Sequence, residues 1–439
     1  MRYGFRTLVL AALATSAAAQ GPAKGPAEGR HADDPAAAGT PAAAPAPKPG
    51  LHPGPPAPIP PAEIAASINR GVAFLLKDQR PDGSWGSPER TKELNIIAGV
   101  GSHHAFRVAT TALCVAALTE ATQAAEARTP GRVELARPED VRRAIERGED
   151  FLFRELPRVR RHDAMLIYNV WAHAYGITAL VRMHGRLPGE GARRDRIEAL
   201  IREQYDRLAR YESAEGGWGY YDFAAGTQRP NSDSASFVDA AVLAAFHDAA
   251  AIGVAPPEKL TRRGVENLVA TRKPDFSYLY GIYLRYRPMM GVNRPGGSLG
   301  RSQACNYALR VWGDEKVTDA VLKEWLDRLI ARNGWLDMGR KRPIPHESHF
   351  QVAGYFYYFG HYYATLCAGL LPTADRAFYQ DHLTHILLSH QERDGSWWDY
   401  PFYNYHQPYG TAFALLSLTH CLHAPAPMPA TTRQPSSPR

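Results

Sequence analysis

The stretch 77-KDQRPDGSWG-86 recurs near the other end of the chain as 389-SHQERDGSWWDY-400. In both copies a glutamine precedes a tryptophan by six residues (Gln79 and Trp85, Gln391 and Trp397), with Asp-Gly-Ser between them. Glycine supplies the backbone freedom to leave a helix, and Asp-Gly-Ser is typical of a turn. We therefore interpret the motif as a structural turn. The tryptophan should pack on the neighbouring hairpin, and the glutamine amide should hydrogen-bond the backbone across the seam.

The body of the chain, residues 62–423, consists of helical segments of two alternating kinds. Some are amphipathic and charged, as in Pro138 to Leu156, and others are apolar nearly all round, as in Ala164 to Val181. An amphipathic helix keeps one face in water, whereas a helix apolar on every side is enclosed. We expect outer helices near 62–78, 138–155, 193–212, 257–272, 315–332 and 374–390, each followed by an inner helix near 105–125, 164–183, 233–250, 300–312, 350–370 and 409–423.

These pairs make six hairpins at a spacing of roughly 60 residues, which indicates a repeat architecture. The turn motif aligns in every hairpin except the second, with its aromatic residue at Trp85, Trp218, Tyr278, Trp335 and Trp397. Closure of such a repeat into a ring removes the need for solvent-facing caps. The predicted fold class is therefore all-α: an α/α toroid with inner helices running parallel inside outer ones.

The pattern Gly-x-x-Phe-Leu-x-x-x-Gln-x-x-x-x-x-Trp, which runs from Gly71 to Trp85, resembles a known repeat. It is similar to the repeat of squalene–hopene cyclases and of the β subunits of protein prenyltransferases, which are α/α toroids. The resemblance covers essentially residues 62–423. It implies a central cavity, so side chains at the starts and on the inward faces of the inner helices are candidates for a site. It does not fix an activity, because one fold hosts several functions.

Class II terpene cyclases of this group use an Asp-x-Asp-Asp stretch to protonate an alkene. The corresponding stretch here is 231-NSDSASF-237, in which Asp233 stands alone. The candidate catalytic residues are Asp233 and Arg301. A single Asp is also an ordinary helix N-cap, and the lack of carboxylate partners disfavours squalene-type cyclisation.

The stretches Gly296 to Gly313 and Tyr358 to Leu370 resemble protein prenyltransferases. In that family an Asp-x-Cys pair and a His bind zinc, which lowers the pKa of the substrate thiol. Cys305 and His361 match the Cys and the His, but Gln303 replaces the Asp and is a poor zinc ligand. The alternatives are a zinc ion at Cys305 and His361, or a buried cysteine and a core histidine.

Histidine, tyrosine and arginine gather at the starts of the inner helices, which predicts a wet, aromatic and mildly basic cavity mouth. This mouth either binds a ligand or contains polar capping and lining groups. The residues concerned are His103, His104, Arg107, His349, Tyr405 and His406.

Three functions are compatible with these features. The first is a terpenoid cyclase-like or prenyltransferase-like protein that acts on or holds an apolar, isoprenoid-like ligand. The second is a non-catalytic binding or scaffold toroid that recognises a peptide or glycan at the ring mouth. The third is polysaccharide cleavage, which needs two carboxylates facing one cleft. The candidate acids for this pair are Asp222, Asp233, Glu347 and Asp399.

The ends of the chain predict export. Arg2 and Arg6 precede the apolar run 7-TLVLAALATSAAA-19, which has the form of a signal peptide cleaved between Ala19 and Gln20. We expect a periplasmic or extracellular protein. Residues 20–61 are rich in Ala and Pro and should form a disordered linker, and residues 424–439 should form a disordered tail.

Composition excludes some classes of partner. The formal net charge is +7, from 51 basic and 44 acidic residues, without a Lys/Arg run of the kind that contacts nucleic acid. No later stretch reaches the roughly 20 apolar residues of a membrane span. The four cysteines lie in apolar helical patterns far apart in sequence, so we expect buried free thiols.

Overall fold

The computed structural model describes residues 52–57, 59–92, 96, 98–126, 133–186, 191–223, 230, 232–347 and 351–422. The predicted signal peptide (1–19), the predicted tail (424–439), most of the predicted linker and His349 lie outside the described residues. The described part is helical, with isolated bridges in place of β-strands. None of its helices combines the length and apolarity that crossing a bilayer requires.

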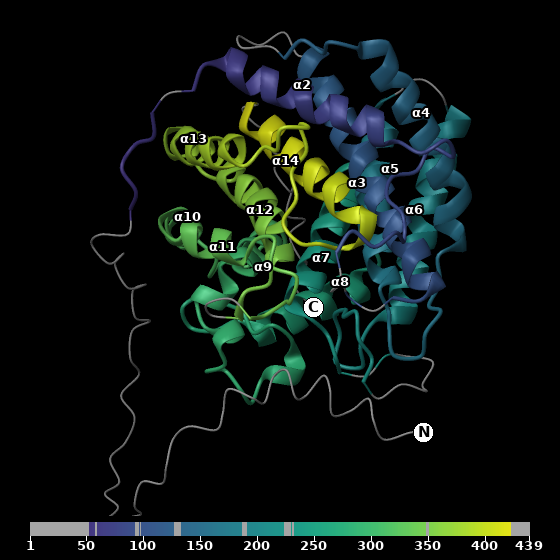
Figure 1. Cartoon of the computed structure of the whole chain (residues 1–439). Coiled ribbons are helices and arrows are strands. Elements are labelled where there is room, and N and C mark those ends of the chain that lie inside the picture. Colours follow the sequence, from purple (N-terminus) through teal and green to yellow (C-terminus); the bar gives the residue numbers. More distant parts are fainter. Residues whose placement is uncertain are drawn as a thin grey trace, which may run out of the picture. The chain divides into compact units, whose positions relative to one another are not determined.

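Six helices form a closed inner ring. Each contacts the next, and the last, α14, returns to contact the first, α3. In Figure 1, α14 (yellow) lies against α3 and α12, so the two ends of the body meet. The inner helices are α3 (Val100–Glu126), α5 (Asn169–Arg186), α7 (Ser236–Ala251), α9 (Leu299–Val311), α12 (Tyr357–Gly369) and α14 (His406–Leu422).

Six further helices surround this ring. Each packs on the inner helix that precedes it in the ring, and α2, the first of the body, packs on α14. The expectation of an α/α toroid with two concentric layers is confirmed. The outer helices are α2 (Pro61–Asp78), α4 (Pro138–Glu155), α6 (Gly191–Tyr211), α8 (Glu258–Thr271), α10 (Asp319–Ala331) and α13 (Thr373–Ser389).

Several boundaries differ from the sequence expectation. The fifth outer helix begins at Asp319 rather than 315, because the Thr318 side chain accepts a hydrogen bond from Val321 N and caps it. A short helix, α11 (Asn333–Gly339), occupies the stretch expected to be a shortened turn. The alignment of Trp335 with the turn motif was wrong: this residue lies on α11 and is 49% exposed.

The turn motif works through tryptophan–glycine contacts. A Cβ at Gly71 would lie 2.8 Å from Trp397 Cζ3, so only glycine admits the indole at this distance. The same relationship joins Gly148 to Trp85 and Gly264 to Trp218. Each tryptophan therefore packs against a glycine of the next outer helix, and Trp397 closes the ring by packing on the first one.

Hydrogen bonds fix the orientation of these turns. The indole N–H of Trp85 donates to Leu75 O at 2.8 Å, and Trp397 donates to Leu387 O at the same distance. The Gln79 amide donates to Ala144 O on α4 at 2.8 Å, as predicted for a bond across the seam. These bonds join each tryptophan to the last turn of its own outer helix, and Gln79 to the next outer helix.

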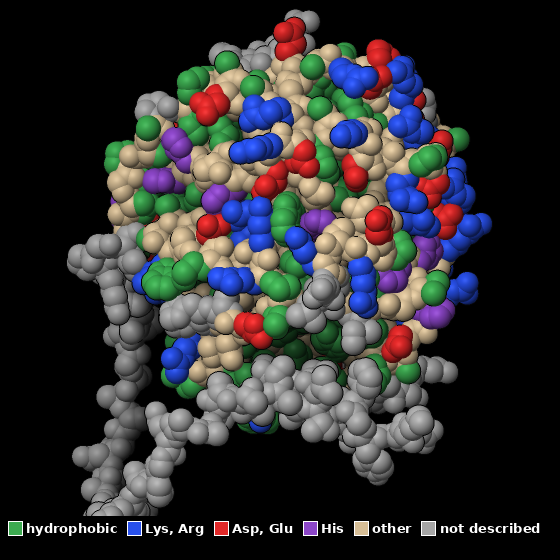
Figure 2. Space-filling model, in the orientation of Figure 1, with side chains coloured by type: hydrophobic (Ala, Val, Ile, Leu, Met, Phe, Trp, Pro, Cys, Tyr) green, Lys and Arg blue, Asp and Glu red, His purple; other side chains and the backbone are tan. Residues whose placement is uncertain are grey.

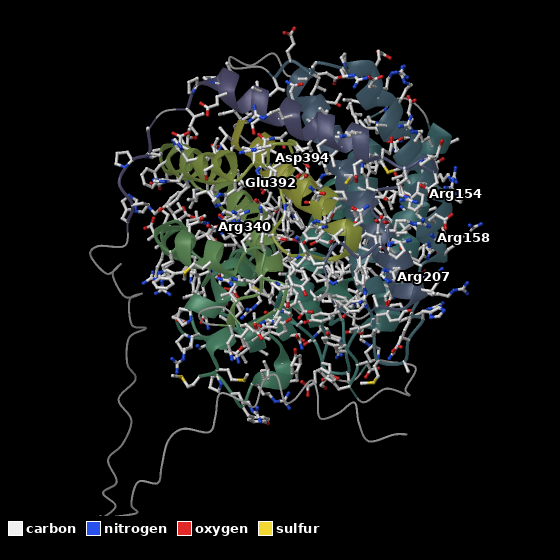
Figure 3. All side chains as sticks on the ribbon, viewed as in Figure 1. Arg154, Arg158, Arg207, Arg340, Glu392 and Asp394 are labelled. Atoms are coloured by element: carbon white, nitrogen blue, oxygen red, sulfur yellow. The ribbon has the colours of Figure 1, made fainter. Side chains whose placement is uncertain are left out.

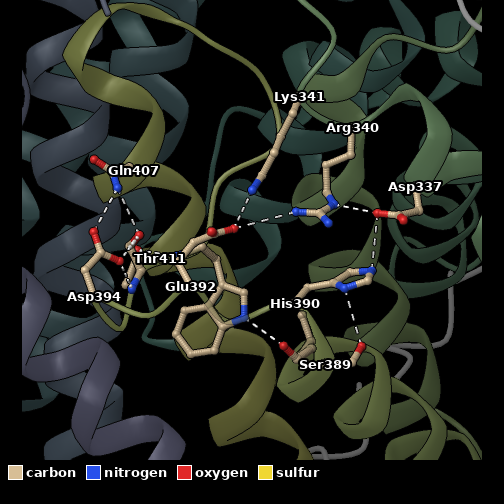
Figure 4. Close-up of polar contacts among 12 residues, drawn as sticks. Asp337, Arg340, Lys341, Ser389, His390, Glu392, Asp394, Gln407 and Thr411 are labelled. Atoms are coloured by element: carbon tan, nitrogen blue, oxygen red, sulfur yellow. Dashed lines mark hydrogen bonds and ion pairs between the residues drawn. The ribbon is translucent and has the colours of Figure 1, made fainter.

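Charged side chains surround the last turn (Figure 4). Lys341 donates to Glu392 Oε1 at 2.6 Å, and Arg340 donates to Asp337 Oδ1 at 2.6 Å. On the other side of the turn, Gln407 Nε2 donates to Asp394 Oδ2 at 3.1 Å. These contacts tie α11 and the start of α14 to the turn and are best read as structural.

The outer helices carry mixed charge on their wet faces. On α4, Arg142 pairs with Glu139 and Glu146, three and four residues away. Figure 2 shows basic and acidic side chains interspersed on the face that includes α2 and α4. Such exposed pairs each contribute little to stability.

The end of the predicted linker is bound to the body. His52 pairs with Asp327 of α10 at 3.1 Å and stacks on Phe378 of α13, with ring centroids 4.8 Å apart. His385 of α13 also hydrogen-bonds Ala57 O. The segment leading into α2 therefore follows the outer layer, where a free tether was expected.

All four cysteines are free, as predicted. Cys114, Cys305 and Cys367 are buried and Cys421 is half-buried. Burial raises the pKa of the Cys305 thiol well above its ordinary value, so this thiol stays protonated.

Candidate ligand-binding site

A layer of aromatic side chains closes one end of the inner ring, where the inner helices begin. Neighbouring members are joined by ring contacts with centroids 4.6 to 6.4 Å apart or by hydroxyl hydrogen bonds, and the sequence of contacts returns to its start. We call this end the N-terminal mouth. The layer consists of Phe106, Tyr168, Tyr220, Tyr280, Tyr355, Tyr400 and Phe402.

The turn motif determines where these tyrosines lie. Tyr220 and Tyr280 each follow a buried seam aromatic, Trp218 or Tyr278, by two residues. The seam residue points outward to the next hairpin, and the residue two positions later lies at the mouth. Tyr220 and Tyr355 are half-buried, whereas Tyr280 is buried.

Three of the hydroxyl groups form a chain that ends on a histidine. Tyr220 bonds Tyr280, Tyr280 bonds Tyr355 at 3.1 Å, and Tyr355 bonds His346 Nε2 at 3.0 Å. His346 Nδ1 lies 2.8 Å from Gln351 O and must donate to it, so Nε2 accepts from Tyr355. Burial lowers the pKa of His346 to about 4, which keeps the ring neutral.

Arg301, a predicted catalytic residue, lies beneath this layer. Its side chain is fully buried, and its guanidinium donates to Gly297 O, Tyr278 O and Val292 O at 2.8, 3.1 and 2.7 Å. The guanidinium also lies 5.1 Å from the centre of the Tyr280 ring. Arg301 therefore positions the loop that carries Tyr280, without direct access to a ligand.

Asp233, the other predicted catalytic residue, lies at the edge of the mouth beside Asp222. Asp233 Oδ2 accepts from Phe223 N at 3.0 Å and does not cap α7, whose N-cap is Ala235. Burial raises the pKa of Asp233, and the nearby charge of Asp222 adds to the rise. Asp222 is fully buried and pairs with Arg161 at 2.9 Å. Its Oδ1 lacks a hydrogen-bond partner among the described residues.

The other two acids proposed for a pair lie elsewhere. Asp399 is buried and accepts from Tyr409 OH at 2.6 Å and Tyr358 N at 3.0 Å; burial raises its pKa to about 6. Glu347 is exposed. The structure thus brings together Asp222 and Asp233 from the four acids.

The predicted mouth residues divide into two groups. His103 stacks with Tyr405 at 6.0 Å between ring centroids, and Tyr405 OH donates to His103 O at 3.1 Å, which joins α3 to the segment before α14. His406 packs edge-on to Trp398, and its Nδ1 hydrogen-bonds Tyr403 O at 2.6 Å. Its pKa is lowered by burial to about 4.

His104 and Arg107 have acidic partners outside the aromatic layer. His104 lies 3.3 Å from Glu155 of α4, and Arg107 lies 3.5 Å from Asp82 in the first turn. Figure 3 shows Arg154 and Arg158 on this side of the body, where both pair with Glu155. His104 and Arg107 are three residues apart and therefore lie on one face of α3.

The two candidate zinc ligands have separate partners. The Cys305 thiol donates to Ser236 O at 3.6 Å, whereas His361 hydrogen-bonds Tyr357 O at 2.7 Å and Asn333 at 2.7 Å. Gln303 Nε2 donates to Trp325 O at 2.9 Å. Within the described ranges, no group of three or more His, Cys, Asp or Glu side chains is placed to hold a metal ion.

Sequence reasoning missed the mouth tyrosines Tyr220, Tyr280 and Tyr355. The spacing of two residues from the seam aromatic was the available signal at Tyr220 and Tyr280. Nothing in the spacing indicated that Tyr355 would join them, because that contact crosses between hairpins.

Comparisons with known proteins agree with the fold. No family model and no curated protein matches the chain. Among solved structures, it is similar to an inactive variant of the α-1,6-mannanase GH76A of Salegentibacter sp. HEL1_6 in complex with α-1,6-mannotetrose. The identity is 10%, the match covers 82% of this chain and 99% of that one, and the TM-score is 0.50.

A possible member of the GH105 family from Klebsiella pneumoniae matches at 11% identity, with 84% and 95% coverage and a TM-score of 0.51. A type II terpene cyclase from Scytonema, in complex with geranylgeranyl dihydroxybenzoate, matches at 14% identity, with 82% and 97% coverage and a TM-score of 0.44. At these identities the likeness concerns the fold. The chain is an α/α toroid.

Proposed function

We propose that this protein is an exported α/α toroid that binds a glycan at its N-terminal mouth. The observation that carries the proposal is the closed aromatic layer with its linked hydroxyl groups Tyr220, Tyr280 and Tyr355. A sugar ring has faces of C–H groups and a rim of hydroxyls. Aromatic faces supply the apolar contact, and phenols both donate and accept hydrogen bonds to the rim.

An apolar isoprenoid fits less well. A chain of that kind needs a deep apolar cavity, and ligand pockets generally have volumes of about 300 to 1,000 Å³. A cavity inside the inner ring has a volume of about 90 Å³, and polar as well as apolar groups line it. The mannanase with a bound tetrasaccharide, which shares the fold, makes α-1,6-linked mannose oligosaccharides the first probes.

The test is a titration of a panel of oligosaccharides, including α-1,6-mannotetraose, into the purified mature protein. We expect saturable binding that weakens about tenfold in Tyr220→Phe and Tyr355→Phe, since each loses one hydroxyl from the mouth. Tyr379→Phe is the matched control, because its hydroxyl bonds Asp327 in the outer layer. Binding that survives in the mouth variants, or that is absent for every glycan, contradicts the proposal.

Cleavage of the bound glycan is a second candidate, favoured by the proximity of Asp222 and Asp233. Asp233, with its raised pKa, would give its proton to the glycosidic oxygen as the bond from that oxygen to the anomeric carbon breaks. Water would form the new bond to that carbon and lose its proton to Asp222. Product release, followed by mass spectrometry, should stop in Asp233→Asn and continue in Asp375→Asn, a control on α13. Binding without any cleavage by the wild type removes this candidate and leaves the first intact.

A further inference from the structure

A second feature lies at the opposite end of the inner ring, where the inner helices end. A cavity of about 90 Å³ is enclosed there by residues of α3, α5, α7, α9, α12 and α14. Four tyrosines line it, each less than one-tenth exposed: Tyr175, Tyr307, Tyr362 and Tyr363. Ring contacts connect three of them, since Tyr363 lies 5.1 Å from Tyr362 and 6.2 Å from Tyr307.

These four tyrosines are buried side chains that line one cavity. Burial raises the pKa of Tyr175, Tyr307 and Tyr363 well above the ordinary value. The groups are therefore neutral phenols, able to accept a hydrogen bond and to offer a ring face.

The charges at the cavity favour a cation. Asp248 and Arg182 both line it. Asp248 and Glu120 both bind the Arg182 guanidinium, with Arg182 Nε 3.0 Å from Glu120 Oε1. Two carboxylates against one guanidinium leave one net negative charge among these three side chains. The ends of the inner helices add partial negative charge from their free carbonyl groups.

We propose that this cavity binds a small organic ammonium ion. Aromatic rings attract such cations by their faces, and an aromatic cage with an adjacent carboxylate suits a methylated or primary ammonium group. The Asp248 side chain is 23% exposed and that of His420 is 34% exposed, so the cavity meets solvent at this end. The site is separate from the glycan site proposed at the N-terminal mouth, and either can exist without the other.

The test uses tetramethylammonium chloride as the probe, at constant ionic strength, with thermal unfolding and calorimetry as readouts. Neutral tert-butanol, which has a similar branched shape, is the matched compound. We expect a saturable rise in Tm with the cation only. Asp248→Asn and Tyr363→Leu should each weaken binding about tenfold or more, whereas Asp375→Asn on α13 should not.

Tyr307→Phe keeps its ring face and should retain binding of tetramethylammonium, which forms no hydrogen bonds. Methylammonium, in contrast, donates hydrogen bonds, so Tyr307→Phe should weaken its binding relative to the wild type more than it weakens the binding of tetramethylammonium. This comparison tests the site if Asp248→Asn fails to fold. An equal response to tert-butanol, no saturable response in the folded wild type, or unchanged affinity in Asp248→Asn and Tyr363→Leu overturns the proposal.

Discussion

Trp397 of the last turn lies against Gly71 of the first helix of the body, at a distance that leaves no room for a Cβ on the glycine. Because these residues are far apart in sequence, their contact closes the ring. The closed ring brings the segment before α14 beside α3, where Phe402 meets Phe106 with ring centroids 4.6 Å apart. Closure of the fold and completion of the aromatic mouth thus depend on the same seam.

Gly71→Ala tests this seam. The new methyl group would meet the Trp397 indole at 2.8 Å and the Leu415 side chain at 3.0 Å. We expect a loss of about 1 to 3 kcal/mol in the free energy of unfolding, measured by urea denaturation. Gly185→Ala on α5 is the control, since a Cβ there meets no atom within 4 Å and alanine favours a helix.

A double-mutant cycle assigns this loss to the indole. In a Trp397→Leu background the obstructing ring is gone, so adding Gly71→Ala should cost less than it does in the wild type. A difference of about 0.5 kcal/mol or more indicates coupling. Additive losses would show that the two residues do not restrain each other.

Arg301 should stabilise the fold by holding the loop that carries Tyr280. Arg301→Met removes the donors to Gly297 O, Tyr278 O and Val292 O, and buried acceptors without partners cost about 1 to 3 kcal/mol each. We expect a lower free energy of unfolding and faster amide exchange in residues 279–284. Arg301→Lys, which restores one donor group, should recover part of both effects. Unchanged exchange in this loop would exclude the positioning role.

Much of the fold could be predicted because its signals are local. Helix periodicity and the repeated turn were sufficient for both layers and for closure. Trp335 misled the alignment because its spacing imitates the motif, while its side chain is on a separate helix. The mouth was harder, since Tyr220, Tyr280 and Tyr355 come from three hairpins and meet only after the ring has closed.

Stability should depend on pH through buried histidines. Burial lowers the pKa of His361 to about 4, below the ordinary value of 6.5, so the folded state binds its proton less readily than the unfolded state. Its contribution is complete above pH 6.5 and is lost as pH falls from 6.5 towards 4, by about 3 kcal/mol. His361→Gln should lose less stability over this range than the wild type, measured by denaturation at each pH.

His162→Gln, which removes an exposed imidazole in place of a buried one, is the comparison variant. Acidification should destabilise the fold through His173, His346 and His406 as well, since their pKa values are also lowered to about 4. His361→Gln should therefore remove only part of the dependence of stability on pH. An identical slope in His361→Gln and the wild type would contradict this assignment.

His52 should hold the segment before α2 against the outer helices α10 and α13. His52→Ala removes the contacts to Asp327 and Phe378, and it leaves the packing of the body intact. We expect faster proteolysis within residues 52–60 and little change in the unfolding of the body. His162→Ala is the control. Equal cleavage rates in His52→Ala and the wild type would show that these contacts do not restrain the segment.

The central claim is that a glycan binds at the N-terminal mouth, and hydrogen–deuterium exchange tests it most directly. The wild-type protein is measured with and without a saturating oligosaccharide from the binding panel. The account predicts slower exchange in residues 220–223, 279–284, 353–357 and 400–405, which carry the mouth. Slower exchange at the other end of the inner ring, in residues 178–182 and 244–248, or no change at the mouth, would contradict it.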